Sequence, residues 1–263
     1  MDMVITGAAS GIGEALVSLL DGEPHTHRLV LVDRDATRLG MVADGSPSTT
    51  SVVVADLADP ASAATIVDAV DAGLGRLDAL VSNAGIIGGG SLLDQGVDDF
   101  DVSFAVNVRA TFLLATAVHG LLSDSRGCLV ATASMSAHHP TPGVGFYSAS
   151  KAALVMLVRQ LAVEWRSDGI RCNSVSPGPT LTPMTAQGYG DPVRRATRET
   201  AIPTGRLGEA VDVARAIRFL VDPSSSQVNG IDLLVDGGMS SMLMPATGGG
   251  TGQTPSQAPV AHQ

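Results

Sequence analysis

Residues 1–20 read MDMVITGAASGIGEALVSLL, an apolar strand that ends in a glycine-rich turn and is followed by a helix-forming run. Gly7, Gly11 and Gly13 mark the turn, and glycine permits a close approach of the backbone to another group. The N-terminus of a helix exposes unpaired N–H groups and the positive end of the helix dipole, which together bind phosphate. The turn therefore predicts a phosphate site, although a turn needed only for helix–sheet packing has the same features.

Apolar strand and helix patterns alternate along most of the chain. Strands are expected at residues 3–6, 28–33, 51–56, 77–85, 127–134, 170–178 and 231–238, and helices at 13–22, 59–73, 97–122, 147–169 and 209–222. This alternation is typical of an α/β fold in which helices cover both faces of a parallel sheet. We expect one domain over residues 1–245, with a substrate loop at about 179–207, and a disordered tail over residues 246–263.

Composition and charge limit the classes of partner. The 263-residue chain is 44% hydrophobic but only 3% aromatic, so aliphatic side chains must build the core. A formal net charge of -10 disfavours nucleic acid and anionic membranes, because it repels phosphate. No stretch reaches the roughly 18 apolar residues of a transmembrane helix, and no signal peptide opens the chain, which predicts a cytoplasmic protein. Cys128 and Cys172 lack metal-ligand spacing and are expected to be buried thiols rather than a disulfide.

An acidic residue follows the second expected strand. Asp33 lies 20 residues after Gly13, where a carboxylate accepts hydrogen bonds from the adenosine ribose of a dinucleotide and repels a 2'-phosphate. This favours NAD over NADP. Arg34 leaves NADP binding possible, since a guanidinium can pair with that phosphate. The same side chain could instead stack on adenine or face solvent. A simple strand-end turn residue is the alternative interpretation of Asp33.

Tyr147 and Lys151 lie four residues apart at the start of an expected helix, so their side chains share one face, about 6 Å apart at Cβ. A nearby ammonium, aided by a positively charged nicotinamide, favours the phenolate and makes Tyr147 a general base near neutral pH. By themselves the two residues also fit an ordinary helix-start pair with a solvated lysine.

The motifs together resemble those of the classical short-chain dehydrogenase/reductase family. The resemblance rests on residues 6–13, Asn83–Ala84–Gly85, Ser134, Tyr147 with Lys151, and Pro177–Gly178, in the family's order and approximate spacing up to Gly238. It implies a Rossmann-type, doubly wound parallel sheet of about seven strands and hydride transfer between NAD(P) and a secondary alcohol or ketone. It also implies a homotetramer and no metal.

The resemblance further implies roles for single residues. Tyr147 is the general acid/base, and Lys151 lowers its pKa and holds the nicotinamide ribose. Ser134 orients the substrate oxygen, and Asn107 holds a water that completes a proton relay. The implied cofactor contacts are Gly7, Ser10, Gly11, Ile12, Gly13, Asp33, Arg34, Asp56, Leu57, Asn83, Ala84, Gly85, Tyr147, Lys151, Pro177, Gly178, Thr180 and Thr182. Asp56 would accept from the adenine amino group, and Thr180 and Thr182 would fix the carboxamide.

The substrate is less visible in the sequence. Apolar residues expected to line the pocket favour an alcohol or ketone on a hydrophobic or alicyclic frame; they are Ile86, Ile87, Met135, Leu181 and Met184. Three arginines, Arg194, Arg195 and Arg198, would suit an anionic substrate, but their helical spacing favours a solvated face. His138 and His139 are expected at the pocket rim or on the surface.

Two other functions stay open. One is an NADPH-dependent ketone or 3-oxoacyl-thioester reductase. The other is a non-catalytic, dinucleotide-binding redox sensor on the same fold. The intact set of Asn107, Ser134, Tyr147 and Lys151 disfavours the sensor, since sensing needs no proton relay.

Overall fold

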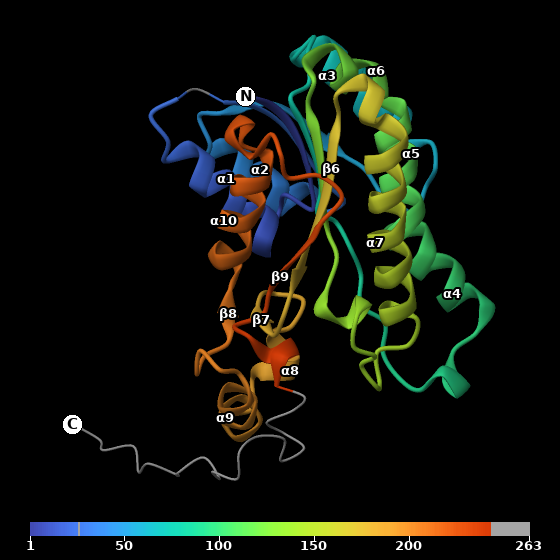
Figure 1. The fold of residues 1–263 in the computed structure, drawn as a ribbon, viewed down its shortest axis with the longest axis vertical. Coiled ribbons are helices and arrows are strands. Elements are labelled where there is room, and N and C mark those ends of the chain that lie inside the picture. Colours follow the sequence, from blue (N-terminus) through green and yellow to red (C-terminus); the bar gives the residue numbers. More distant parts are fainter. Residues whose placement is uncertain (26, 243–263) are drawn as a thin grey trace.

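A parallel seven-stranded sheet forms the centre of the computed structural model, which describes residues 1–25 and 27–242 (Figure 1). Its strands are β1 (Asp2–Thr6), β2 (Arg28–Asp33), β3 (Thr49–Val54), β4 (Ala79–Ser82), β5 (Cys128–Thr132), β6 (Arg171–Pro177) and β9 (Asp232–Val235). The order β3-β2-β1-β4-β5-β6-β9 runs outward from β1 in both directions, which is the reversal of a doubly wound sheet. The predicted fold class is confirmed, and the tail expected over residues 246–263 lies outside the described residues.

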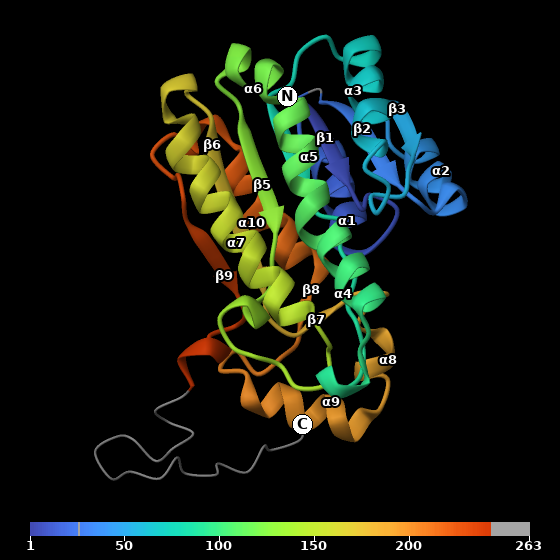
Figure 2. The same cartoon turned by 90° about the vertical axis from the view of Figure 1, so that its right-hand side faces the viewer.

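Helices cover both faces of the sheet (Figures 1 and 2). One face carries α1 (Gly11–Asp21), α2 (Ala36–Asp44) and α10 (Ala210–Val221), and the other carries α3 (Ser62–Gly73), α5 (Ala110–Ala117), α6 (His119–Ser125) and α7 (Tyr147–Glu164). Because side chains alternate along a strand, Met3 and Ile5 of β1 enter one core while Val4 enters the other. Both cores are aliphatic, as the composition predicts.

The helix expected over residues 97–122 is divided. It consists of α4 (Val97–Phe104), a π-helical turn η2 (Ala105–Arg109), α5 and, after a break at Val118, α6. A π turn inserts one extra residue into the helical ladder and turns the side chains around it, and such turns are frequent at functional sites. The correction matters because Asn107 lies in this turn.

The stretch Val97–Ala117 also corrects the expectation about membranes. In the described part of the chain it is the one helical stretch long and apolar enough to cross a membrane by length and composition. Its inward side chains Ala110, Leu114 and Ala115 belong to one of the two cores. A buried core helix meets the same criterion, and 44% of the apolar window is buried here, so packing on the sheet accounts for part of this composition.

Two further regions differ from the sequence prediction. The helix α2 was not predicted, because only Leu39 is buried among its nine residues; Asp35, whose side chain accepts from Arg38 N at 3.0 Å, was the available N-cap signal. The expected loop at 179–207 contains β7 (Thr180–Leu181), α8 (Ala186–Tyr189) and α9 (Pro192–Ala201), and is closed by β8 (Gly208–Glu209). Short 3-10 turns complete the described chain: η1 (Leu92–Asp94), η3 (Met135–Ala137), η4 (Trp165–Asp168), η5 (Pro223–Ser225) and η6 (Met239–Ser241).

The glycine turn after β1 is packed against backbone. Gly7 has a φ of +66°, in the left-handed region that favours glycine. A Cβ on Gly13 would lie 2.1 Å from the Gly7 carbonyl oxygen, so no other residue fits at this point without moving the turn. This contact fixes the start of α1 against the end of β1.

We therefore expect Gly13→Ala to lower the free energy of unfolding by about 1–3 kcal/mol, as overpacking of a close contact does. Gly40→Ala is the matched control, because Gly40 is also helical and a Cβ there meets nothing within 4 Å. That control should raise the free energy of unfolding by about 0.5–1 kcal/mol through its better helix propensity. Urea unfolding of both variants measures the difference, and equal effects would contradict the assigned contact.

Candidate active site

A cavity of about 1160 Å³ runs along the carboxyl ends of the strands. In an open α/β sheet this is the edge at which ligands bind. The helices α8 and α9 lie beyond it, at the lower end of the molecule in Figures 1 and 2. The cavity is large enough to hold a dinucleotide and a small substrate together, since typical single-ligand pockets span roughly 300–1,000 Å³.

Most residues predicted from the sequence meet in this cavity. Its walls include Gly7, Ser10, Gly11, Ile12, Asp33, Arg34, Asp56, Leu57, Asn83, Ala84, Gly85, Ser134, Tyr147, Lys151, Pro177, Gly178, Thr180 and Thr182. Gly13 and Asn107 do not line it. Gly13 lies beneath the turn against Gly7, and Asn107 is buried one layer behind the wall.

Asn83 holds the glycine turn in place. Its Nδ2 donates to the carbonyls of Thr6 and Gly7, each at 3.2 Å. The Thr6 hydroxyl accepts from the N–H groups of Asn83 and Ala84 at 3.0 Å, and Thr132 donates to the Asn83 Oδ1 at 3.0 Å. The ends of β1, β4 and β5 are thereby joined around one amide side chain.

Ser82, the last residue of β4, joins that strand to α5. Its hydroxyl and that of Thr111 on α5 are 2.7 Å apart and hydrogen-bonded. Both side chains are buried, so each satisfies the other. This hydrogen bond fixes the end of β4 directly before the turn at Asn83.

The acidic end of the cavity is formed at the end of β2. Asp33 accepts from Ala9 N through Oδ2 and from Asp35 N through Oδ1, each at 3.1 Å. An ionised carboxylate has about four acceptor sites, so two remain for a ligand. Arg34 lines the same region. Asp56, after β3, accepts from Ala58 N at 2.9 Å and is the other acidic residue lining the cavity in the described chain.

The π turn aims Asn107 at the backbone beside the cavity. Its Oδ1 accepts from Ile86 N at 2.9 Å, and its Nδ2 donates to Ile86 O and to the Ser150 hydroxyl, each at 3.0 Å. The Ser150 hydroxyl in turn donates to Tyr147 O at 2.8 Å. Asn107 thus links the strand end of β4 to the first turn of α7.

Tyr147 and Lys151 point from α7 into the cavity, with the lysine Nζ 5.8 Å from the centre of the tyrosine ring. Lys151 is buried, and its Nζ donates to Thr132 O at 2.7 Å. Burial lowers the pKa of Lys151 to about 8, because the charged form loses solvation. Gly85 keeps this space open, since a Cβ there would lie 3.1 Å from the Nζ.

The expected acidification of Tyr147 is not seen in this structure. Burial raises the pKa of Tyr147, and the hydrogen-bonding Ser134 hydroxyl offsets part of the rise. Desolvation acts on both partners, so the lysine loses much of its own preference for the charged form. The spacing in the sequence predicts that Tyr147 and Lys151 lie together. It does not predict how deeply they are buried, and burial sets the direction in which each pKa moves.

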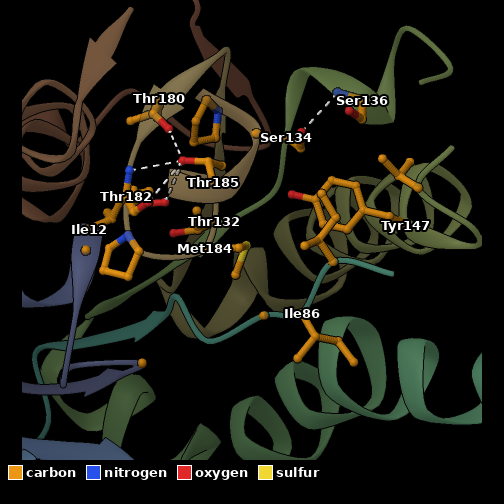
Figure 3. A pocket seen from close by; sticks show the side chains of 18 of the residues that line it. Ile12, Ile86, Thr132, Ser134, Ser136, Tyr147, Thr180, Thr182, Met184 and Thr185 are labelled. Carbon is orange, nitrogen blue, oxygen red and sulfur yellow. Dashed lines mark hydrogen bonds between the residues drawn. The ribbon is translucent and has the colours of Figure 1, made fainter. Parts of the chain in front are cut away.

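Ser134 is the serine beside Tyr147. Figure 3 shows both side chains directed toward the same part of the cavity. Ser134 follows β5 in extended backbone, and its hydroxyl accepts from Ser136 N at 3.1 Å. Ser136 also lines the cavity, whereas Ser148 does not and accepts from Thr141 N at 3.2 Å.

The apolar wall agrees with the expectation at four of five positions. Ile86, Ile87, Met135 and Met184 line the cavity, and Figure 3 shows Met184 near its middle. Leu181 does not line it, although Thr180, the other residue of β7, does. His138 and His139 also lie outside the wall and are exposed; His138 is 2.6 Å from the buried carboxylate of Asp232.

The segment after β6 supplies residues that the sequence did not reveal. Thr185, Gln187 and Tyr189 line the cavity, and the Thr185 hydroxyl donates to Thr180 O and fastens this wall (Figure 3). Arg194 and Arg198 also line it, while Arg195 does not. All three arginines are exposed, as the expected solvated face requires, and two of them also line the cavity. Tyr189 is one of only two tyrosines in the chain, and this rarity was the feature of the sequence that could have pointed to it as a site residue.

Other site types have little support in the described residues. Within residues 1–25 and 27–242 no group of three or more His, Cys, Asp or Glu side chains is gathered as a metal site would require. Cys128 and Cys172 are buried free thiols on neighbouring strands, as predicted. Burial raises the pKa of Cys128 to about 11 and that of Cys172 to about 12, so both are unreactive near neutral pH.

Comparisons with known proteins agree with this geometry. The family model described as Enoyl-(Acyl carrier protein) reductase matches residues 7–240. D-threitol dehydrogenase of Mycolicibacterium smegmatis is 34% identical over 239 residues, covering 89% of this chain and 91% of that protein. Meso-2,3-butanediol dehydrogenase of Serratia marcescens is 33% identical over 237 residues, covering 90% and 93%. The structure of 3-ketoacyl-(acyl-carrier-protein) reductase from Brucella melitensis, complexed with NADH, has a TM-score of 0.82 at 30% identity and covers 91% and 98%.

The buried Lys151 predicts a stability cost that depends on pH. Its pKa falls from an ordinary 10.5 to about 8, so the unfolded chain binds more protons between these values and stability rises with pH across that window. At pH 7 the cost is about 3 kcal/mol, at roughly 1.4 kcal/mol per pKa unit. We expect Lys151→Met to be more stable than the wild type at pH 7, and the gain to shrink as pH rises from 8 toward 10.5. Urea unfolding across this range tests it, and a gain independent of pH would contradict the assignment.

Proposed function

The chain belongs to the classical short-chain dehydrogenase/reductase family of NAD(P)-dependent oxidoreductases, and we propose that it interconverts a secondary alcohol and a ketone with Tyr147 as general acid and base. One observation carries the proposal. Tyr147, Ser134 and Lys151 converge on one cavity whose other end is the glycine turn of a dinucleotide fold.

The residues present fit a dinucleotide. Gly7 is packed against Asn83 and Ala84, where a Cβ would lie 2.9 Å from each, and it lines the cavity together with Gly11 and Ile12 at the N-terminus of α1. A bound nicotinamide supplies the hydride acceptor or donor. On the chain's side, the glycine turn would hold the phosphates and Asp33 the adenosine ribose. Lys151 would hold the nicotinamide ribose and Thr182 the carboxamide.

The proton path follows from the hydrogen bonds at α7. In oxidation, the Ser134 hydroxyl would donate to the substrate oxygen while the Tyr147 phenolate takes the hydroxyl proton. In reduction, Tyr147 returns the proton, and its raised pKa suits that role as an acid near neutral pH. The lysine ammonium would stabilise the phenolate when it forms. Asn107 would extend the path by holding a water beside the Ile86 backbone and Lys151.

The cofactor preference that we propose is NAD. The Asp33 carboxylate at the end of β2 supports it, since this charge would repel a 2'-phosphate. Arg34, in the same wall, is the group that would favour NADP. The second candidate function is an NADPH-dependent 3-oxoacyl-thioester reductase, which the similarity to the ketoacyl reductase favours.

The assembly that we propose is a homotetramer in the cytoplasm, without membrane or nucleic-acid partners. Large apolar side chains remain exposed along α4, α5 and α7 of the single chain, where a second copy would cover them; they are Val97, Phe100, Val102, Phe112, Met156 and Val163. The two free thiols suit a reducing compartment, and the net charge of -10 repels anionic polymers and surfaces.

Removal of the Tyr147 hydroxyl tests the chemistry. We expect Tyr147→Phe to lower kcat for 2,3-butanediol or a cyclic secondary alcohol by at least about 10²–10⁴-fold, because general acid–base catalysis is lost. NADH binding, followed by its fluorescence, should survive. Ser148→Ala is the control: this serine is the next residue but lies outside the cavity wall, and the variant should keep most of its turnover. Full turnover in Tyr147→Phe would remove the assigned base.

Exchange of Asp33 tests the cofactor preference. Wild-type protein should bind NADH at least about tenfold more tightly than NADPH, since like charges about 4 Å apart near a protein surface repel by roughly 4 kcal/mol. Asp33→Asn should narrow that ratio, whereas Asp56→Asn should weaken both cofactors alike. Fluorescence titration measures all four affinities, and a wild type that binds NADPH as tightly as NADH would overturn the preference.

A further inference from the structure

The helix α9 presents one face to the cavity. Val193, Arg194, Thr197 and Arg198 line the cavity, and their spacing of one, four and five residues places them on one side of a helix. The helix is the outer wall of the site, beyond the strand ends (Figure 2). Two solvent-exposed arginines therefore line the same cavity as Tyr147.

The three arginines of α9 differ in their partners. Arg195 lies outside the cavity wall, and its Nε is 2.9 Å from the Glu199 carboxylate. The Arg194 Nε is 3.6 Å from the exposed Asp191 carboxylate, a distance that leaves only a weak, screened pair. For Arg198, no carboxylate lies within 4.0 Å anywhere in residues 1–25 and 27–242. Arg198, the arginine of α9 without a carboxylate partner in the described residues, is thus one of the two that line the cavity.

The charges around the cavity sharpen this contrast. The acidic residues of its described wall, Asp33 and Asp56, both follow strands at the adenosine end. The wall from Ser134 to Arg198 contains no acidic residue among those described, although the chain as a whole carries a net charge of -10. The charged residues of this part of the wall, Lys151, Arg194 and Arg198, are thus all basic, while the carboxylates of Glu199 and of Asp191, the N-cap of α9, lie outside the wall.

Tyr189 joins the arginines to the reacting end. It is half-buried in the wall between α8 and α9. Burial raises the pKa of the Tyr189 hydroxyl, and the Arg198 guanidinium offsets part of this rise, so the two groups lie within electrostatic reach. Tyr189 in turn adds to the raised pKa of Tyr147. Tyr147, Tyr189 and Arg198 line the same cavity, with Tyr189 within electrostatic reach of the other two.

We propose that the substrate is a secondary alcohol or ketone that carries an anionic group at its far end, and that Arg198, assisted by Arg194, binds that group. This rests on the proposed function. A carboxylate several bonds from the carbinol carbon satisfies both ends, since guanidinium binds a planar carboxylate through two parallel hydrogen bonds. The apolar residues Ile86 and Met184 line the same cavity and would contact the connecting carbons.

Matched pairs of substrates test the charge. Wild-type enzyme with saturating NAD is assayed on 3-hydroxybutanoate, 4-hydroxypentanoate and 5-hydroxyhexanoate, each beside its neutral primary amide. For at least one chain length, kcat/KM should be about tenfold higher for the carboxylate than for the amide, and the ratio should shrink at about 1 M salt, where exposed charges are screened. Equal values at every length would overturn the proposal.

Two variants on the same helix locate the site. Arg198→Gln should lower the carboxylate-to-amide ratio of kcat/KM about tenfold. Arg195→Gln removes the same charge from α9 outside the cavity wall and should keep the wild-type ratio. An equal fall in both variants would reduce the effect to the general charge of the helix and overturn the assigned site. Urea unfolding of both variants identifies any loss that comes from the fold.

A binding measurement separates this proposal from the proposed function. If the wild type oxidises none of these alcohols or 2,3-butanediol, the proposed function fails, and the anion site is judged by calorimetric titration of 4-oxopentanoate and 4-oxopentanamide into the enzyme with NADH. Tighter binding of the carboxylate that is lost in Arg198→Gln and kept in Arg195→Gln supports the site. The anion site is overturned if the two compounds bind with equal affinity or if neither compound binds.

Discussion

The close contact between the Gly13 backbone and the Gly7 carbonyl is the constraint on which the site depends. It brings the first turn of α1 against the end of β1, and Asn83 then fastens the same turn to β4 with two hydrogen bonds. Thr132 adds β5 to this arrangement. At the carboxyl edge of the sheet, the strand ends are thus held together by this backbone contact and by the side chains of Asn83 and Thr132. The residues that follow those strands therefore have fixed positions.

The proposed catalytic residues are held at some expense to the stability of the fold. Lys151 is buried with its Nζ on a backbone carbonyl, and its pKa is lowered to about 8. Asn107 occupies a π turn, which departs from the regular ladder of hydrogen bonds. Both features serve the space beside Tyr147 rather than the packing of the core. Such departures from local rules are expected where residues are retained for function.

The sequence predicted the features that repeat along the chain, such as the apolar strands, and those that depend on residues close together in the sequence. Each apolar run became a strand of the sheet because parallel strands covered on both faces must be apolar along their whole length. The spacing of Tyr147 and Lys151 needed only the period of one helix. The helix α2 escaped prediction because Leu39 is its one buried residue, and the π turn at Asn107 escaped because an extra residue leaves no mark in the hydrophobic period.

What depends on tertiary position was beyond the reach of the sequence. Arg194, Arg195 and Arg198 have one chemistry and one helix, yet only the placement of α9 decides which of them face the cavity. Leu181 was expected in the wall but pairs in β7 instead. The direction of the Tyr147 pKa likewise follows from burial, which the spacing of two residues does not contain.

The ends of the substrate segment meet. β7 pairs with β8 in a separate two-stranded sheet, and Gly208 N donates to Pro179 O at 2.9 Å, so the two ends of a segment of about 28 residues meet at one narrow neck before the chain enters α10. Inside that neck lie α8, α9 and the arginines, while the phenol, the lysine and the glycine turn lie outside it. One continuous segment therefore supplies much of the proposed substrate wall, although Ile86 and Met135 lie outside it and Thr182, proposed to fix the carboxamide, lies inside it. Exchange of this segment would alter that wall while Tyr147, Lys151 and the glycine turn stay in place.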